Sequence, residues 1–384
     1  MTWGKGKWSQ YDATRRTSIN FMDPKNRLND DVDKVNATIS RVRRRPGRLK
    51  DDYVTLAHGA GGKASAALVE QVFYDGFGNE LLGQAGDSAV FDVAETSRLA
   101  MSTDSYVVNP IEFPGGSIGE LAVNGTVNDL AVAGAVPTYL TAAFILEEGV
   151  EISVLRRVVA AMSAAAERAG VLIVAGDTKV VPRGACDRLY ITTAGVGEIP
   201  AGRDLGFHRV NPGDLLLLSG PIADHGMSVM MARGDLAIDA PIESDTREVA
   251  SLTAALLAAA PGTRWMRDAT RGGLATVMNE LAEQTGLAVL LEDTALPVRP
   301  MTRAACDILG IDPLYVANEG TFAAVIAAEE AEAALAALHA AGAPDACLIG
   351  KVAAEPEASV VLLTAFGGTR MVDKLVGDPL PRIC

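Results

Sequence analysis

The sequence predicts an α/β protein of two domains, and three observations support this prediction. The chain has 384 residues, more than a single hydrophobic core usually supports. From residue 51 onward, short apolar runs typical of buried strands alternate with longer segments of helical periodicity. A segment rich in glycine and proline, 199–214, interrupts this alternation near the middle of the chain. We therefore expect one domain over 51–205 and a second over 206–376.

Each expected element rests on its local pattern. Strands are short apolar runs next to glycine turns, and helices show apolar spacing of three and four residues with a closing glycine such as Gly170. In the first domain we expect a strand with a glycine-rich loop (54–65), a helix (66–73), a strand (98–108), a helix (118–137), a strand (140–148), a helix (153–170) and a strand (171–181). In the second we expect a strand (211–220), helices (244–260 and 272–286), strands (287–292 and 321–328), a helix (329–342) and a strand (359–365).

Charge separates the first fifty residues from the rest. Residues 1–50 contain thirteen Lys or Arg and five Asp or Glu, a net charge of +8, whereas the whole chain carries −14. With few periodic apolar residues, this arm is predicted to be a disordered basic extension outside the fold. The remaining body is acidic, which disfavours nucleic acid as a partner.

Composition also bounds the cellular setting. The sequence has no apolar run long enough to span a bilayer, and its first residues are polar, unlike a signal peptide. It has four cysteines and no Cys-x-x-Cys pair, which is typical of a reducing compartment and argues against a zinc knuckle. We therefore expect a cytoplasmic protein with no membrane partner.

Acidic residues follow apolar runs at several points, in contexts where a carboxylate is costly unless it is paired or bound to a cation. Hard oxygen ligands suit Mg²⁺, which proteins usually hold together with substrate phosphates. Lys179, two residues after Asp177, can neutralise a transferring phosphoryl group, although a simple ion pair with a neighbouring acid would also explain this lysine. The residues in question are Asp87, Asp104, Asn128, Asp129 and Asp177.

Other motifs carry weaker signals. The glycines of 58–65 are too close together for a Walker A loop, and a tight turn explains them equally well. The segment 268–273 leads into a helix whose first N–H groups, with Arg271, can receive an anion. Asp224 is explained by helix capping. Glu319, between an apolar run and a glycine, is poorly explained by a structural role.

The chain ends in Gly377–Cys384, where two prolines favour an extended tail that ends in a thiol. Taken together, the motifs of residues 53–384 resemble the HypE-type hydrogenase maturation factors of the PurM-like ATP-binding superfamily. One departure is Ala223, where family members tend to have glycine. The matching motifs are LAHGAGGKA, STDSYVV, FPGG, GTVNDLAVAGAVP, FILEEG, GDTKVV, DHG, RDATRGG, ANEG and the terminal PRIC.

The resemblance implies a two-domain PurM-like fold whose N-terminal domains pair their sheets across a homodimer, with a flexible tail at 377–384. It implies that Cys384 receives a carbamoyl group from a HypF-type carbamoyltransferase. ATP-dependent dehydration would then yield a thiocyanate whose cyanide passes to iron on a HypC–HypD-type scaffold. Lys179 and Glu319 would contact the thiocarboxamide. Mg–ATP would be held by Asp87, Asp104, Asn128, Asp129 and Asp177, with Asp87, Asp104 and Asp129 as metal ligands and Arg271 near the phosphates.

Two alternatives remain open on the sequence. Other enzymes of the superfamily, such as aminoimidazole ribonucleotide synthetase, selenophosphate synthetase and thiamine-phosphate kinase, share the ATP chemistry but do not account for a C-terminal thiol. A non-catalytic scaffold with a docking tail would not account for the acidic residues.

Overall fold

The computed structural model describes most of the chain, namely residues 62–68, 70–71, 89–94, 97–234 and 240–375. The predicted arm and the predicted tail lie outside the described residues, and so do Asp87 and Cys384. Within the described part, no helix is both long enough and apolar enough to cross a membrane.

The first sheet has five strands and confirms the α/β class predicted for this half of the chain. β5 and β6 are parallel, and all other neighbours are antiparallel. A crossover helix joins the two parallel strands, as such a pair requires. The strands, in spatial order, are β1 (Ala89–Ala94), β2 (Ser97–Tyr106), β7 (Leu189–Ile199), β5 (Val136–Glu147) and β6 (Leu172–Val181).

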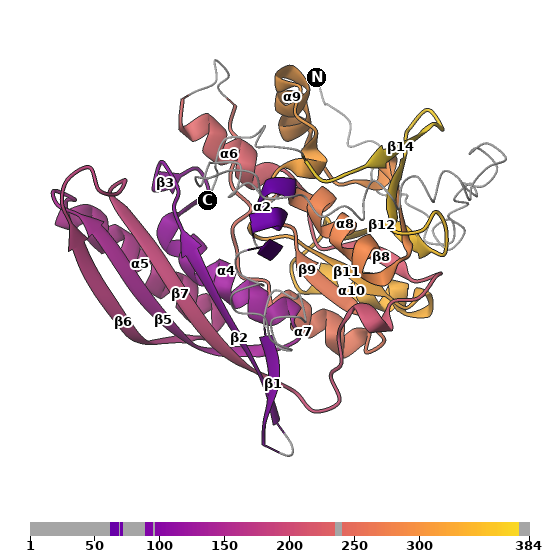
Figure 1. Cartoon of the computed structure of the whole chain (residues 1–384), viewed down its shortest axis with the longest axis horizontal. Coiled ribbons are helices and arrows are strands. Elements are labelled where there is room, and N and C mark those ends of the chain that lie inside the picture. The colour runs from indigo at the N-terminus through magenta and orange to yellow at the C-terminus, as the bar shows by residue number, and fades with distance from the viewer. Residues whose placement is uncertain (1–61, 69, 72–88, 95–96, 235–239, 376–384) are drawn as a thin grey trace, which may run out of the picture.

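Helices α4 (Ile118–Val132) and α5 (Ile152–Ala169) lie against one face of this sheet (Figure 1). α4 is buried on nearly all sides because its small residues allow close approach. A Cβ added at Gly119 would lie 2.4 Å from the carbonyl oxygen of Val158 in α5. α4 is therefore a central helix, packed between the sheet, α5 and the second half of the chain.

The opposite face of the first sheet exposes large apolar side chains. On β2, Ala100 is buried beneath α4, whereas its neighbour Met101 points away from the helices and is half exposed. The edge strand β6 is exposed along nearly its whole length. The exposed apolar residues of β2, β5 and β6 on this face are Met101, Val136, Tyr139, Ile145 and Leu172.

The second sheet has seven strands and is covered on both faces. Alternate residues of β8 and β11 contact α8 on one face and α7 with α10 on the other. In spatial order the strands are β14 (Thr369–Val372), β13 (Ser359–Leu363), β10 (Ala288–Glu292), β12 (Cys347–Ala353), β8 (Leu215–Leu218), β11 (Phe322–Ile326) and β9 (Trp265–Asp268). The helices are α6 (Asp224–Ala232), α7 (Ala250–Ala259), α8 (Gly273–Thr285), α9 (Pro300–Leu309) and α10 (Ala331–Ala340).

Short elements complete the fold. The helix α2 (Lys63–Leu68) lies beside the end of the described chain, because the Lys63 N–H donates to the carbonyl of Leu375 at 3.2 Å. A small hairpin, β3 (Glu112–Phe113) and β4 (Gly116–Ser117), precedes α4. Turns of 3₁₀ helix occur at Phe207–Arg209, Asp293–Ala295, Pro313–Tyr315 and Ala328–Glu330.

The two halves share their cores. Ala131 and Val132 of α4 pack with apolar residues of α7, β8 and β11. Residues of α6 and α9, including Met227 and Cys306, pack into the core of the first half. The predicted boundary near residue 205 lies in the irregular segment between the last strand of the first sheet and the first strand of the second.

One predicted helix begins at a later residue than expected. A helix was expected over 244–260, but α7 starts only at Ala250. The preceding residues are not helical because their side chains bond to other parts of the molecule: Ser244 to His225, and Asp245 to the backbone of Glu319 and Gly320.

The close approach of α4 and α5 gives a stability prediction. Gly119→Ala should lower the free energy of unfolding by about 1–3 kcal/mol, because the added methyl overlaps the Val158 carbonyl and must force the helices apart. Thermal or urea unfolding measures this. The control Ser163→Ala, at an exposed position of α5, should leave the midpoint unchanged. A Gly119→Ala protein as stable as the wild type would contradict this account of the packing.

Candidate active site

Acidic side chains from both halves of the chain meet at the junction between the two sheets. Asp104 comes from β2 and Asp129 from α4, while Asp268 ends β9 and Glu319 precedes β11. The charge of Asp104 acts on both Glu319 and Asp268, and Tyr106, buried beside them, feels Asp104, Glu319 and Asp129. We call Asp104, Asp129, Asp268 and Glu319 the acidic cluster.

Strand alternation places the first members of this cluster. In β2, Ala100, Ser102 and Tyr106 are buried on the face toward α4, and Asp104 shares that face by its spacing of two. The Ser102 hydroxyl donates to Asp129 of α4 at 2.5 Å, which holds that carboxylate against the strand. The predicted strand and helix therefore do bring Asp104 and Asp129 to one place.

Glu319 is almost completely buried, with 5% of its surface exposed. Burial raises the pKa of its carboxyl well above the usual range, and the negative charges of Asp104 and Asp268 raise it further. Arg271, in the loop before α8, opposes this effect with its positive charge. A carboxyl in this setting holds its proton more firmly than usual, and as a carboxylate it is a strong base.

Asp268 belongs to the cluster although its own motif had directed attention only to Arg271. Burial raises its pKa to about 6, while the adjacent Arg267 lowers it. Arg267 itself forms an ion pair with Glu280 of α8, at 3.4 Å. No apolar run precedes Asp268, since Arg267 stands directly before it, so the sequence carried no signal of the kind that pointed to Asp104.

Asn128 has a different setting from its neighbour Asp129. Its side-chain amide is buried and bonds to backbone groups of the second half: Nδ2 donates to the carbonyls of Arg247 and Glu319, and Oδ1 accepts from the N–H of Val249. The amide therefore joins α4 to two loops of the second half, and contact with a nucleotide stays a prediction.

Asp177 and Lys179 lie apart from the cluster within one chain. They form an ion pair at 3.1 Å on the edge strand β6, with side chains 63% and 71% exposed. The row of partners through Ser105, Thr192, Ala143 and Asp177 crosses three strand spacings, or about 14 Å. The structure thus brings Asp104, Asp129, Glu319 and Arg271 together but leaves Asp177 and Lys179 on an exposed edge.

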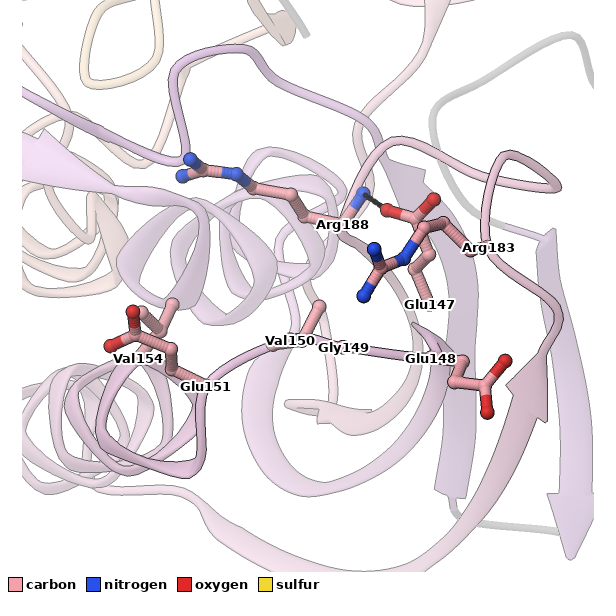
Figure 2. Close-up of a pocket in the computed structure, with 8 residues that line it drawn as sticks. All are labelled: Glu147, Glu148, Gly149, Val150, Glu151, Val154, Arg183 and Arg188. Carbon is pink, nitrogen blue, oxygen red and sulfur yellow. Dashed lines mark hydrogen bonds between the residues drawn. The ribbon is translucent and has the colours of Figure 1, made fainter.

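A separate pocket of about 380 Å³ lies near the end of β5, between the start of α5 and the β6–β7 turn. Figure 2 shows Arg183 and Arg188 on that turn, with Glu147 bonded to the backbone N–H of Arg188. Glu147 also accepts from the N–H of Gly184, and these bonds lower its pKa. None of the predicted site residues lines this pocket. The carboxylate of Glu147 instead fixes the β6–β7 turn.

The donor set fits a hard divalent cation in its chemistry. Asp104 and Asp129 offer carboxylate oxygens at one place, and a third predicted ligand, Asp87, lies outside the described residues. Among the described residues, no group of three or more His, Cys, Asp or Glu is arranged to hold a metal ion.

Comparisons with known proteins assign the chain to a family. Models of the AIR synthase related protein match the chain in two parts, the N-terminal domain over residues 85–199 and the C-terminal domain over 211–362. Carbamoyl dehydratase HypE of Rhodobacter capsulatus is 54% identical over 343 residues, which cover 88% of this chain and 99% of the relative. The chain belongs to the HypE family.

Solved structures of HypE proteins share the fold. The chain is similar to the protein in a crystal structure of a HypE–HypF complex, with a TM-score of 0.76 and 42% identity over 80% of this chain and 100% of that one. HypE in complex with ATP matches with a TM-score of 0.72 and 45% identity, covering 86% of this chain and 100% of that one. The predicted two-domain PurM-like fold is confirmed for this HypE-family chain.

The buried carboxyl of Asp268 predicts a pH-dependent effect on stability. Its pKa is about 6 in the folded protein and about 3.9 in an unfolded chain, so its ionisation destabilises the fold as pH rises from about 4 to 6. Asp268→Asn removes this cost. It should stabilise the protein at pH 7 by about 1–3 kcal/mol and much less at pH 4.5.

Urea unfolding of the wild type and of Asp268→Asn at pH 4.5 and pH 7 measures the difference in their free energies of unfolding. Asp187→Asn, at an exposed position in the β6–β7 turn, is the control and should show no such trend. An Asp268→Asn gain that is the same at pH 4.5 and pH 7 would show that the carboxyl is not strained by its surroundings.

Proposed function

We propose that this chain is an ATP-dependent dehydratase that converts a carbamoyl group on Cys384 into a thiocyanate. Membership of a family whose curated relatives are named carbamoyl dehydratase, and the ATP complex of one HypE structure, support this proposal. The observation that carries it is that buried Glu319 meets Asp104 and Asp129 at the junction of the two sheets, where its carboxylate can take up an amide proton.

The chemistry proceeds in two balanced steps. The amide oxygen of the S-carbamoyl group attacks the γ-phosphorus of ATP, ADP leaves, and one N–H proton is lost. The resulting imidate then releases inorganic phosphate as the second N–H proton departs and a C≡N bond forms on sulfur. Glu319 takes up an amide proton, and a lysine ammonium such as Lys179 stabilises charge on the transferring phosphoryl group.

We assign nucleotide binding to the acidic cluster and its neighbours. Asp87, Asp104 and Asp129 would hold Mg²⁺, which when bound neutralises phosphate charge and orients the γ-phosphoryl group. Arg271 would contact the phosphates from the start of α8, and Asp177 would complete the set. Asn128 would contribute through the loops that its amide holds in place.

We propose a homodimer in which the exposed face of the first sheet is covered by the same face of a second copy. The apolar residues of β2, β5 and β6 form a surface of the kind that marks an interface. Within one chain, Lys179 and Asp177 lie about three strand spacings from β2. In such a dimer, the partner subunit would also bring its own Lys179 and Asp177 to the interface.

The further partners follow from the proposed reaction. A carbamoyl group must be delivered to Cys384, and a HypF-type carbamoyltransferase would do this; one solved relative is a HypE–HypF complex. A HypC–HypD-type scaffold would accept the cyanide for the iron of a [NiFe] hydrogenase. We propose that the protein acts in the cytoplasm and does not bind nucleic acid.

The identity of the reacting thiol is tested by mass. With a carbamoyl donor system, the C-terminal peptide should gain one carbamoyl group at Cys384 and then, with ATP, lose the mass of one water. Cys384→Ser should abolish cyanide formation because an oxygen ester cannot release cyanide, while the fold and ATP affinity stay unchanged. Alanine at Cys186, Cys306 or Cys347 should leave both mass changes intact. An adduct on one of these three cysteines would refute the proposal.

The roles of Lys179 and Glu319 are tested by single-turnover dehydration. Lys179→Ala and Glu319→Gln should each accept carbamoyl on the tail yet lose dehydration by a factor on the order of 100 or more. Lys351→Ala, in β12 of the second sheet, is the control and should keep the wild-type rate. Wild-type turnover in either site variant would remove that residue from the mechanism.

Mixed dimers of the same two variants locate Lys179. If Lys179 serves the Glu319 of the partner subunit, a statistical mixture of Lys179→Ala and Glu319→Gln chains should regain about one quarter of wild-type activity, since half of the dimers then carry one intact site. Absence of recovery in dimers shown to be mixed would place both residues in the site of one subunit.

A further inference from the structure

The loop before α7 bonds both to α6 and to the loop that carries Glu319. Residues 240–249 follow α6 and end where α7 begins at Ala250. Ser244 Oγ bonds to His225 Nδ1 of α6 at 2.8 Å, and the Thr246 N–H donates to the same hydroxyl. These bonds fix the backbone on both sides of Asp245.

Asp245 uses both carboxylate oxygens on the backbone of the Glu319 loop. Oδ1 accepts from the N–H of Glu319 at 2.9 Å, and Oδ2 accepts from the N–H of Gly320 at 3.0 Å. Hydrogen bonds to a charged acceptor are stronger than neutral ones, and two from successive residues fix the orientation of a peptide unit. The pair holds the backbone from which the Glu319 side chain extends.

The carbonyls of the same two residues are held as well. Asn128 donates to the carbonyl of Glu319 at 3.2 Å, and Arg247 Nε donates to the carbonyl of Gly320 at 3.0 Å. Every backbone polar group of Glu319 and Gly320 is thus bonded, by side chains of α4 and of the loop 240–249. Gly320 is required here because a Cβ would lie 1.9 Å from the carbonyl oxygen of Asp245.

The Asp245 carboxylate costs stability in this place. Burial raises its pKa to about 6, which the two N–H bonds only partly offset. The charge of Arg247, in the same loop, interacts favourably with this carboxylate. Burial disfavours a charge at this position, and the two backbone bonds are what the charged carboxylate provides there.

We propose that Asp245 is a positioning residue for Glu319, which through its two backbone bonds aims the Glu319 carboxyl at the reacting amide. This rests on the proposed function and deepens it, because both carboxylate oxygens of Asp245 are engaged by the backbone of the Glu319 loop. A displacement of about 1 Å at a catalytic group can cost on the order of 100-fold in rate. Loss of Asp245 should therefore slow the chemical step, because the Glu319 carboxyl is displaced from the reacting amide.

The test uses Asp245→Asn in the full-length, carbamoylated protein. The asparagine can accept only one of the two N–H groups, and its NH₂ faces the other. Single-turnover dehydration should fall by a factor on the order of 10 to 100, with KM for ATP within about twofold of wild type. Hydrogen exchange of the peptide that contains residues 317–322 should become faster by about 10-fold or more, because two amides lose a charged acceptor.

Asp214→Asn is the matched control. Asp214 is also a buried aspartate of the second half, which accepts from the N–H of Asn211 at 2.8 Å and pairs with Arg264 at 3.5 Å. This variant should lose stability but keep the wild-type dehydration rate and the exchange rate of residues 317–322. Gly320→Ala, which displaces the same peptide without changing a charge, should reproduce the Asp245→Asn defect.

A double variant separates positioning from a general structural role. Glu319→Asp already withdraws the carboxyl by one methylene, so adding Asp245→Asn should cost less than about threefold more. Full multiplication of the two defects would refute the inference, and so would Asp245→Asn with wild-type dehydration. If the wild type itself produces no thiocyanate, the proposed function fails instead, whereas the exchange measurement still tests whether Asp245 holds the loop.

Discussion

The side-chain amide of Asn128 is the interaction on which the site depends. It joins α4, the central helix of the first half, to the loop before α7 and to the loop that carries Glu319. This buried amide thereby adds three hydrogen bonds between the halves to the apolar packing that they share. Asp129 is the next residue along the same helix. The hydrogen bond from Asn128 to the Glu319 carbonyl therefore also fixes the position of Asp129 relative to Glu319.

Electrostatics then gives this junction its character. Burial, and after it the repulsion between neighbouring carboxylates, raises the pKa values of Glu319 and Asp268, and the charge of Arg271 opposes this at Glu319. Like charges are held together here because the backbone of each is fixed by packing and hydrogen bonds rather than by mutual attraction. The arrangement favours any positively charged partner, and a divalent cation between phosphates and carboxylates would relieve the most repulsion.

The sequence predicted the fold class and part of the site, and the reason differs from residue to residue. Asp104, Asp129 and Glu319 were found because a carboxylate beside a buried run is costly unless it has a task. The setting of Asn128 was not evident, since an amide can bind a ligand or a backbone equally well. Asp245 was not evident because it lies in the polar stretch 244–248, which the predicted helix included, while its bonding partner lies 74 residues away. Pairing across such a separation is decided by tertiary structure.

The edge position of β6 has a consequence for solubility. An edge strand with unpaired backbone groups and exposed apolar side chains is a template for uncontrolled pairing with other chains. In β6, whose sequence is LIVAGDTKVV, the charged residues are Asp177 and Lys179. Charges in such a strand act as gatekeepers against aggregation, and lysine is especially effective. Lys179 therefore protects the chain before assembly as well as serving the chemistry proposed for it, so evolution of one property constrains the other.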